Sequence, residues 1–187
     1  SVLRGQVLSF VQSEYGSDAG ATFLRRPEVD ADDVVLGAGV LDEVVDHVVG
    51  IGEQRAALLA AGQHLKRGVL LYGPPGTGKT LTIRHLLTRT TGVTAILLTG
   101  SSIAATGAAA EIARTFQPSL GVMEDIDLVA MERHSSPQPL LFEVLDALHG
   151  PDGDADVASV LTTNTRSACE RAPTDGPGRG CLPSVAP

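Results

Sequence analysis

Two stretches of the sequence carry residues whose types and spacing suit the handling of a phosphate group. The first, residues 73–80, reads Gly-Pro-Pro-Gly-Thr-Gly-Lys-Thr and fits the pattern G-x-x-x-x-G-K-[ST]. Glycines let such a loop wrap closely around phosphate oxygens, where a Cβ atom would clash. Backbone N–H groups of residues 76–80 would then point at an anion from the start of a helix, a favourable position for negative charge. We therefore predict that this loop binds the phosphates of a nucleotide.

Two side chains of the loop are predicted to act on the bound nucleotide. Lys79 would place a positive charge against the β- and γ-phosphates, and the Thr80 hydroxyl would be a ligand of Mg2+. The alternative is an ordinary glycine-rich turn, but at average glycine usage the bare pattern arises by chance in about one chain in a hundred. The other members of the predicted nucleotide-binding set are Gly73, Pro74, Pro75, Gly76, Thr77 and Gly78.

The second stretch is a run of acidic residues that follows the short apolar segment 118–123. Glu124 and Asp125 come directly after it, and Asp127 is two residues further on. Acidic side chains at the carboxyl end of a buried strand lie where open α/β sheets bind their ligands. We assign Glu124 to Mg2+ and Asp125 to the orientation and activation of the attacking water, and leave Asp127 without a defined role. The alternative is a helix start decorated with acids, which the helix dipole favours by itself.

Alternating strand and helix patterns surround both stretches. Short apolar runs typical of buried strands are separated by segments with helical periodicity. Such alternation predicts a parallel sheet with helices on both faces, which is a three-layer α/β sandwich. The predicted strands are residues 69–72, 93–99, 120–123 and 157–163, and the predicted helices between them are residues 79–90, 108–116 and 139–149.

The sequence divides into three parts. Residues 1–33 are interrupted by glycine, proline and acidic residues, and we expect an extended arm or the end of an upstream domain, with a short strand at residues 7–11. Residues 34–164 form the predicted core. Residues 165–187 lose all periodicity, and their density of proline and glycine predicts an irregular, disordered tail.

Composition excludes some classes of partner. The net charge of −8 argues against a broad nucleic-acid surface, which needs clustered Lys and Arg. No apolar run reaches the roughly 18–20 residues of a membrane span, and no signal peptide is recognised. Cys169 and Cys181 fit neither a zinc ligand set nor a redox motif. We therefore expect a cytoplasmic protein without nucleic-acid or membrane partners.

Three segments together resemble the motifs of AAA-type P-loop ATPases. Residues 67–80 resemble the Walker A entry, residues 118–127 the Walker B strand and residues 161–164 the sensor-1 strand, and the resemblance extends over residues 34–164. It implies a P-loop NTPase sheet in the order 5-1-4-3-2. It also implies that Asn164 lies between the Walker motifs, where its amide would hold the γ-phosphate or the attacking water. ATP and Mg2+ as ligands, ADP as product, a homo-oligomeric ring and a protein client are further implications.

Four features depart from the family pattern. The family usually has Asp-Glu where this chain has Glu124-Asp125, so the predicted base is shorter by one C–C bond, about 1.5 Å. The loop 101–108 lacks the aromatic residue of the substrate-threading members. Of the family's two finger arginines only Arg179 has a counterpart, and a solvated loop arginine is its alternative. The small helical lid of the family is absent from this sequence.

The leading hypothesis is a Mg2+-dependent ATP hydrolase module that remodels a partner within an oligomer. The alternative is a nucleotide-binding assembly module that does not hydrolyse ATP, because the finger and lid are damaged or missing. A P-loop kinase for a small molecule is a weaker third hypothesis, since no acceptor-binding lid is visible. Scattered family residues in the tail suggest a frame error in the coding sequence, and the rival interpretation is a divergent loop that orders against a ring neighbour.

Overall fold

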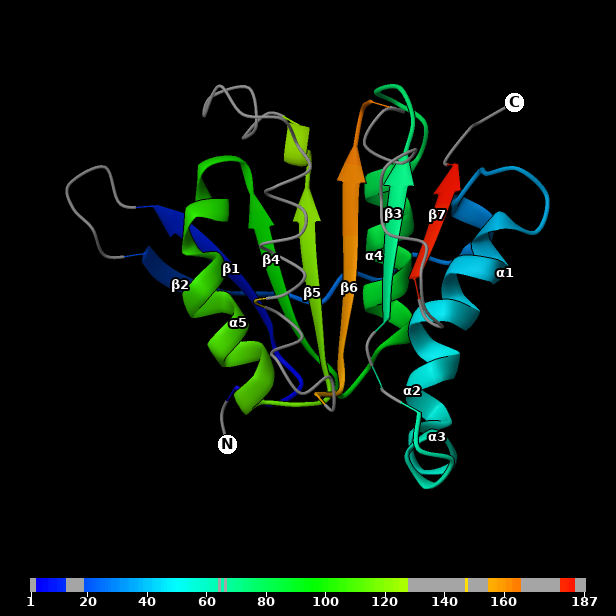
Figure 1. The fold of residues 1–187 in the computed structure, drawn as a ribbon. Helices are drawn as coiled ribbons and strands as arrows, with labels where there is room; N and C mark the ends of the chain where they lie inside the picture. The colour runs from blue at the N-terminus through cyan, green and yellow to red at the C-terminus, as the bar shows by residue number, and fades with distance from the viewer. Residues whose placement is uncertain are drawn as a thin grey trace.

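The structure is a computed structural model, which describes residues 3–12, 19–63, 65, 67–127, 147, 155–165 and 179–183. Its centre is a seven-stranded sheet in the order β2-β1-β4-β5-β6-β3-β7 (Figure 1). Within this sheet β1 and β2 are antiparallel, and the other paired strands run parallel. The strands are β1 Val7–Gln12, β2 Ala19–Leu24, β3 Arg67–Tyr72, β4 Thr94–Thr99, β5 Ser119–Glu124, β6 Val157–Thr163 and β7 Arg179–Pro183.

Helices cover both faces of the sheet. Side chains of each strand alternate between the two faces, so Val69 and Leu71 of β3 join one hydrophobic cluster while Leu70 joins the other. The first cluster includes Ile83 of α4, and the cluster of Leu70 includes Ala109 of α5. The predicted three-layer α/β sandwich is therefore confirmed. The helices are η1 Ala31–Asp33, α1 Val40–Val45, η2 Asp46–Gly50, α2 Ile51–Glu53, α3 Arg55–Ala60, α4 Lys79–Arg89, η3 Gly100–Ala105 and α5 Thr106–Thr115.

The strand order implied by the family resemblance is also confirmed. When β3 is counted as the first core strand, β7-β3-β6-β5-β4 is the order 5-1-4-3-2. The fifth of these strands lies in the segment for which the sequence predicted no regular structure: Arg179–Pro183 pair in parallel with β3. Proline is tolerated at a sheet edge, where its missing N–H does not interrupt a ladder on both sides. Residues 166–178 and 184–187 of the expected tail, and the predicted helix 139–149 apart from residue 147, lie outside the described residues.

The N-terminal residues differ from the expected extended arm. Strand β1 pairs in parallel with β4, and Val7, Leu8 and Phe10 are buried in the core. Strand β2 then forms the outer edge of the sheet (Figure 1). The predicted short strand at residues 7–11 is confirmed, but it is part of the central sheet.

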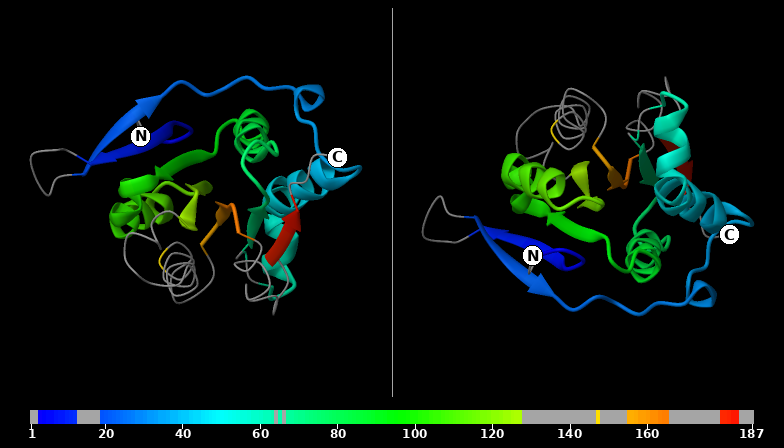
Figure 2. Two further views of the ribbon diagram at one scale, coloured as in Figure 1. Left: turned by 90° about the horizontal axis from the view of Figure 1, so that it is seen from above. Right: turned by 90° about the horizontal axis from the view of Figure 1, so that it is seen from below.

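An extended segment, residues 25–36, leads from β2 past α4 toward the glycine-rich loop (Figure 2). We call it the N-terminal strap. Its Arg26 donates hydrogen bonds to the backbone oxygens of Leu87 at 2.6 Å, Val93 at 2.7 Å and Gly5 at 3.1 Å. The Leu87 carbonyl belongs to the last turn of α4, where carbonyl groups lack helical partners and a cation is favourable. The strap is thus bound to the helix that begins at the loop.

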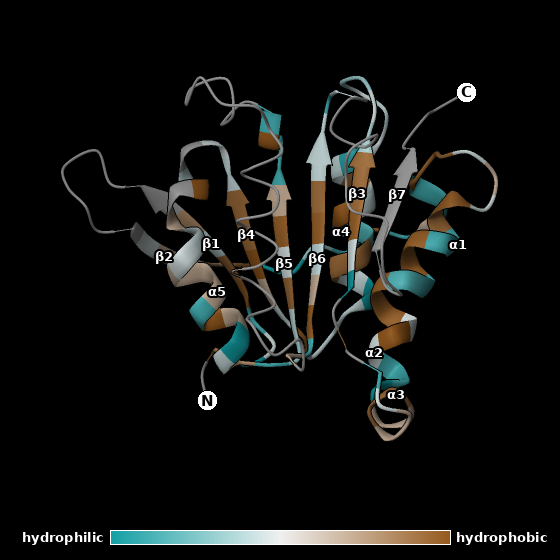
Figure 3. Cartoon of the chain, in the orientation of Figure 1, coloured by the Kyte–Doolittle hydropathy of each residue, from teal (hydrophilic) through white to brown (hydrophobic). Residues whose placement is uncertain are grey.

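None of the helices in the described part of the chain is long and apolar enough to span a membrane. Apolar residues fill the central parts of the parallel strands, and hydrophilic residues gather above the ends of β5, β6 and β3 (Figure 3). That end of the sheet holds the candidate site.

Candidate active site

The glycine-rich loop connects the end of β3 at Tyr72 to the start of α4 at Lys79. Gly76 and Gly78 both have φ of +85°, a left-handed conformation that glycine adopts without strain. At Gly78 a Cβ atom would stand 3.5 Å from the Val35 oxygen and from a methyl group of Leu36, which is ordinary contact. Glycine is therefore required here by the backbone conformation, and the end of the N-terminal strap packs directly against the loop.

Lys79 bends back over this loop. The residue is buried, with 7% of its surface exposed. The Nζ atom donates to the carbonyl oxygens of Gly73 at 2.6 Å and Pro74 at 3.0 Å, and to Asn164 Oδ1 at 3.0 Å. Burial lowers the pKa of Lys79, and the charges of Asp125 and Asp127 oppose this shift.

A pocket of about 470 Å³ lies beside the loop. This volume is within the usual range of sites for small molecules and cofactors. Two of its lining residues, Asp125 and Asn164, come from the ends of β5 and β6, so the structure brings together predicted site residues from three segments. The described lining residues are Pro75, Gly76, Gly78, Lys79, Thr80, Leu81, Asp125 and Asn164.

Asp125 is held in an unusual backbone conformation. Its φ is +52°, which is uncommon for a residue other than glycine. Its backbone N–H donates to the Thr162 Oγ1 atom of β6 at 2.9 Å, and its Oδ1 accepts from Asn164 Nδ2 at 3.2 Å. Strained backbone of this kind is concentrated at functional sites, where neighbouring contacts maintain it. The two contacts with β6 fix both the backbone and the carboxylate of Asp125.

Asn164 connects the loop to the acidic segment. Its Oδ1 accepts from Lys79, while its Nδ2 donates to Asp125 and, at 3.4 Å, to Asp127 Oδ2. Its backbone N–H donates to Asp127 Oδ1 at 3.1 Å. The sequence assigns no defined role to Asp127, and it places Thr162 in the segment that resembles the sensor-1 strand without giving its side chain a role. Their positions, two residues after Asp125 and two before Asn164, were the available signal.

Glu124 is half-buried at the end of β5 and is not among the described residues that line the pocket. Burial raises the pKa of its carboxyl group, the charge of Asp125 raises it further, and Arg84 acts in the opposite direction. Of the predicted metal pair, exposed Thr80 is therefore among the described pocket residues and Glu124 is not. Within the described ranges, no group of three or more His, Cys, Asp and Glu residues could hold a metal ion by itself.

The structure places the backbone of Arg179 away from this chain's own pocket. Arg179 pairs with Gly68, near the start of β3, whereas the glycine-rich loop follows Tyr72 at the other end of that strand. At about 3.3 Å per residue the separation along the strand is about 13 Å. Arg179 is thus the one predicted catalytic residue that the fold does not bring to the loop.

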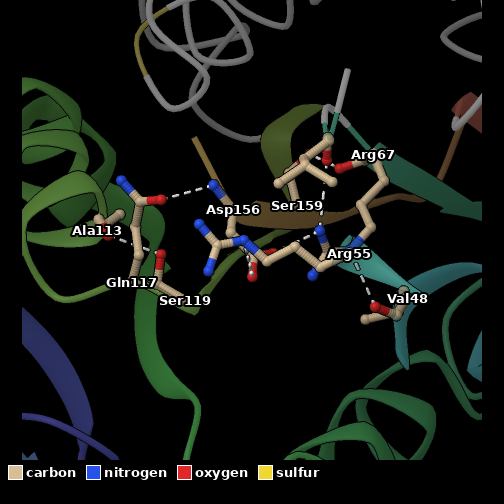
Figure 4. A network of polar contacts seen from close by, with 9 residues as sticks. Val48, Arg55, Arg67, Ala113, Gln117, Ser119, Asp156 and Ser159 are labelled. Atoms are coloured by element: carbon tan, nitrogen blue, oxygen red, sulfur yellow. Dashed lines mark hydrogen bonds and ion pairs between the residues drawn. The ribbon is translucent and has the colours of Figure 1, made fainter. Parts of the chain in front are cut away.

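A second group of buried charges lies at the opposite end of the sheet, and we call it the basal cluster (Figure 4). Arg67, 4% exposed, donates to Asp156 Oδ1 at 2.8 Å, and Asp156 is 3% exposed. Arg67 also donates to the Val48 oxygen at 3.0 Å. Arg55 lies 3.7 Å from the second carboxylate oxygen, and Gln117 accepts from the Asp156 backbone N–H at 2.7 Å. The cluster ties β3, β6 and η2 together.

A parallel sheet in the order 5-1-4-3-2, with a glycine-rich loop between its first strand and a helix, defines an α/β protein of the P-loop ATPase class. A family model described as "ATPase family associated with various cellular activities (AAA)" matches residues 69–175, more than half of the chain. The chain belongs to the AAA family of ATPases.

Relatives similar to this chain include proteins named as ATP-dependent zinc metalloproteases and as spastins, and each matches over part of its length. The ATP-dependent zinc metalloprotease FtsH of Ureaplasma parvum serovar 3 is 32% identical over 80% of this chain and 22% of the relative. FtsH 1 of Thermomicrobium roseum is 30% identical over 85% of the chain and 26% of the relative. Spastin of Drosophila erecta is 30% identical over 74% and 20%. The chain therefore spans about a fifth to a quarter of the length of these relatives.

Proposed function

We propose that this chain binds ATP with Mg2+ and hydrolyses it, as the nucleotide module of an oligomer that remodels a partner protein. The observation that carries the proposal is the pocket in which the glycine-rich loop, Asp125 and Asn164 meet. A phosphate site, a carboxylate and an amide within one pocket are the groups that hydrolysis of a phosphoanhydride needs.

Lys79 has neutral partners that phosphate could replace. Its Nζ donates to two loop carbonyls and to the amide oxygen of Asn164. Hydrogen bonds from an ammonium to charged phosphate oxygens are shorter and stronger than those to neutral carbonyls. Lys79 would therefore exchange the loop carbonyls for the β- and γ-phosphates, and Asn164 would be left to hold the γ-phosphate or the attacking water.

Asp125 is proposed to orient that water and accept its proton. Asn164 already donates to one carboxylate oxygen of Asp125, so the other is the candidate proton acceptor. Because the side chain is one C–C bond shorter than the glutamate usual in the family, the position of its backbone matters more. The left-handed conformation held by Thr162 sets that position.

The oxygen atoms of Thr80 and Glu124 fit Mg2+, which favours one or two protein oxygens together with water and phosphate oxygens. Bound Mg2+ would neutralise negative charge on the phosphate oxygens. Thr80 lies in the pocket and Glu124 carries a carboxyl group that burial discourages from ionising. A divalent cation nearby would favour its charged form.

The oligomer and the client belong to the whole protein, of which relatives suggest that this chain is a part. The backbone of Arg179, on β7, pairs with Gly68 at the end of β3 remote from the pocket, which favours a neighbouring subunit's pocket for its proposed role as an arginine finger. Relatives named as metalloproteases support a protein as the client.

The test is titration of the 187-residue chain with a fluorescent ATP analogue. Lys79→Ala removes the positive charge from the loop, so affinity should fall by about 1.5–3 kcal/mol, the scale of hydrogen bonds to charged groups. Arg89→Ala is the matched control, because it removes an exposed cation from the other end of α4 and should leave affinity unchanged. Equal affinity of Lys79→Ala and the parent protein would remove the phosphate-binding assignment.

Phosphate release then separates hydrolysis from binding alone. If neighbours complete each site, turnover per chain should rise with protein concentration. Stoichiometric binding without phosphate release at any concentration would favour the alternative, a nucleotide-binding module for assembly. That alternative is retained because the family's usual base is replaced by Asp125.

A further inference from the structure

Asp127 is buried beside the pocket without lining it. The residue is 8% exposed, and both of its carboxylate oxygens accept from the same neighbour. Oδ1 accepts from the backbone N–H of Asn164 at 3.1 Å, and Oδ2 lies 3.4 Å from the side-chain Nδ2 of Asn164. One carboxylate thus holds both the main chain and the side chain of the residue that joins Lys79 to Asp125.

These contacts decide which end of the Asn164 amide faces which partner. In the observed orientation the oxygen accepts from the Lys79 ammonium, and the NH2 group donates to Asp125 and Asp127. In the reversed orientation, the NH2 group would face the ammonium, and the oxygen would face two carboxylates. Both contacts would then be repulsive, so the negative charge of Asp127 disfavours reversal.

We infer that Asp127 is a positioning residue for the reaction: it holds the Asn164 amide in the orientation that a γ-phosphate or attacking water would meet. The inference rests on the proposed function, because the amide orientation matters to catalysis only if ATP enters the pocket. Asp127 acts through Asn164 and touches neither nucleotide nor water. Its charge also opposes the lowering of the Lys79 pKa.

A purely structural role would have a different signature. Breaking the same contacts would then lower the stability of the chain without changing how it distinguishes ATP from ADP. Asp156 in the basal cluster provides the matched comparison, because it is also a buried aspartate. Its partners are Arg67 and Gln117, and it lies at the other end of the sheet from the pocket. Asp156→Asn should lower stability and leave nucleotide discrimination unchanged.

The test variant is Asp127→Asn, which keeps an oxygen that can accept from the Asn164 backbone N–H. The NH2 group of the new asparagine would face the NH2 group of Asn164, so the contact that orients the Asn164 side chain is lost. The contact with the Asn164 backbone N–H is kept. Turnover should fall by about 10- to 100-fold, as when a partner that orients a reactive group is removed, and KM should stay within about threefold. The preference for ATP over ADP in direct titrations should fall as well.

A double-mutant cycle with Asn164→Ala shows whether the two residues act as one unit. If Asp127 works through Asn164, the double variant should be no worse than Asn164→Ala alone. Additive losses in the cycle, or an Asp127→Asn variant with the parental preference for ATP, would overturn the inference. The discrimination readout serves even if the isolated chain releases no phosphate.

Nucleotide binding by the unsubstituted chain distinguishes failure of the proposed function from failure of the positioning role. A parent that binds neither ATP nor ADP refutes the proposed function, and the inference with it. A parent that prefers ATP, together with an unchanged Asp127→Asn variant, refutes the positioning role and leaves the proposed function standing.

Discussion

The two ends of the sheet each hold a group of buried charges, and they differ in how those charges are paired. In the basal cluster, Arg67 and Asp156 form an ion pair at 2.8 Å, and Arg55 adds a second cation to the same carboxylate. At the loop end, Lys79 donates only to neutral oxygens among the described residues, and no ion pair joins it to Asp125 or Asp127.

The difference in pairing indicates that the basal cluster stabilises the fold and that the charges at the loop end form a binding site. A buried charge whose partners are complete stabilises the packing of the elements that carry it, and gives a ligand nothing to bind. A cation and two carboxylates that meet through an amide remain available to a ligand with charges of its own. The comparison can be tested by removing charge from each end and recording whether chemistry or stability responds.

The largest effect is expected at the loop end, on turnover. Asp125→Asn preserves the size of the side chain and removes the proton acceptor, so ATP turnover should fall by about 10²- to 10⁴-fold, the usual contribution of a general base. Nucleotide affinity should be unchanged or higher. Phosphate release and titration of the same samples check both. If Glu124→Gln abolishes turnover instead, while Mg2+-dependent binding is intact, the two acidic residues have the opposite roles.

A smaller effect, on stability, is expected at the basal end. Asp156→Asn leaves the Arg67 guanidinium buried without its counter-charge, and the free energy of unfolding should fall by about 3 kcal/mol, near the lower end for broken buried ion pairs. Urea unfolding followed by circular dichroism measures the loss. Equal stability of Asp156→Asn and the parent would show that the pair does not hold β3 to β6, and would remove the contrast between the two ends.

The smallest effect is a dependence of stability on pH through Glu124. Burial and the charge of Asp125 raise the pKa of this carboxyl group in the folded chain, so the folded state keeps the proton more tightly than the unfolded state does. The resulting contribution is present below the ordinary pKa of glutamate and is lost as pH rises through the raised value. Glu124→Gln should therefore gain stability relative to the parent as pH increases across that window. Urea unfolding at a series of pH values would show no such gain if the carboxyl group were free in solvent.

Local patterns were sufficient to predict the centre of the fold. The apolar runs and helical periods gave the buried strands, and strand ends gave the positions of Asp125 and Asn164. What the sequence could not show were pairings between distant segments. Three residues of β1, Val7 to Ser9, pair with β4 across more than eighty residues of sequence, and the contact of Arg67 with Asp156 spans a similar sequence separation. Strand β7 was missed because Gly180 and Pro183 weaken the local strand signal.

The site was predicted less completely than the fold, because residue types do not reveal which side chains form hydrogen bonds with one another. The sequence presents Asp127 as one acid among several, yet its two oxygens both accept from Asn164, a residue that follows a different strand, β6. Glu124 and Asp125 are neighbours in sequence, but of the two only Asp125 is among the described residues that line the pocket. The left-handed backbone of Asp125, which helps to set its direction, is not visible in the residue types.

The strap determines where the protein can be shortened. Its Arg26 is the donor for three carbonyl oxygens that belong to α4, to the segment before β4 and to the turn before β1. A shortened chain that begins at residue 34 would keep every residue of the loop and pocket. It would, however, leave the Leu87 and Val93 oxygens without the Arg26 donor, and β4 without β1 on one of its two sides. A bare edge strand with an apolar sequence is a template for self-association. A shortened chain that keeps both sides of β4 paired therefore has to begin before β1, not at the first residue that resembles the family.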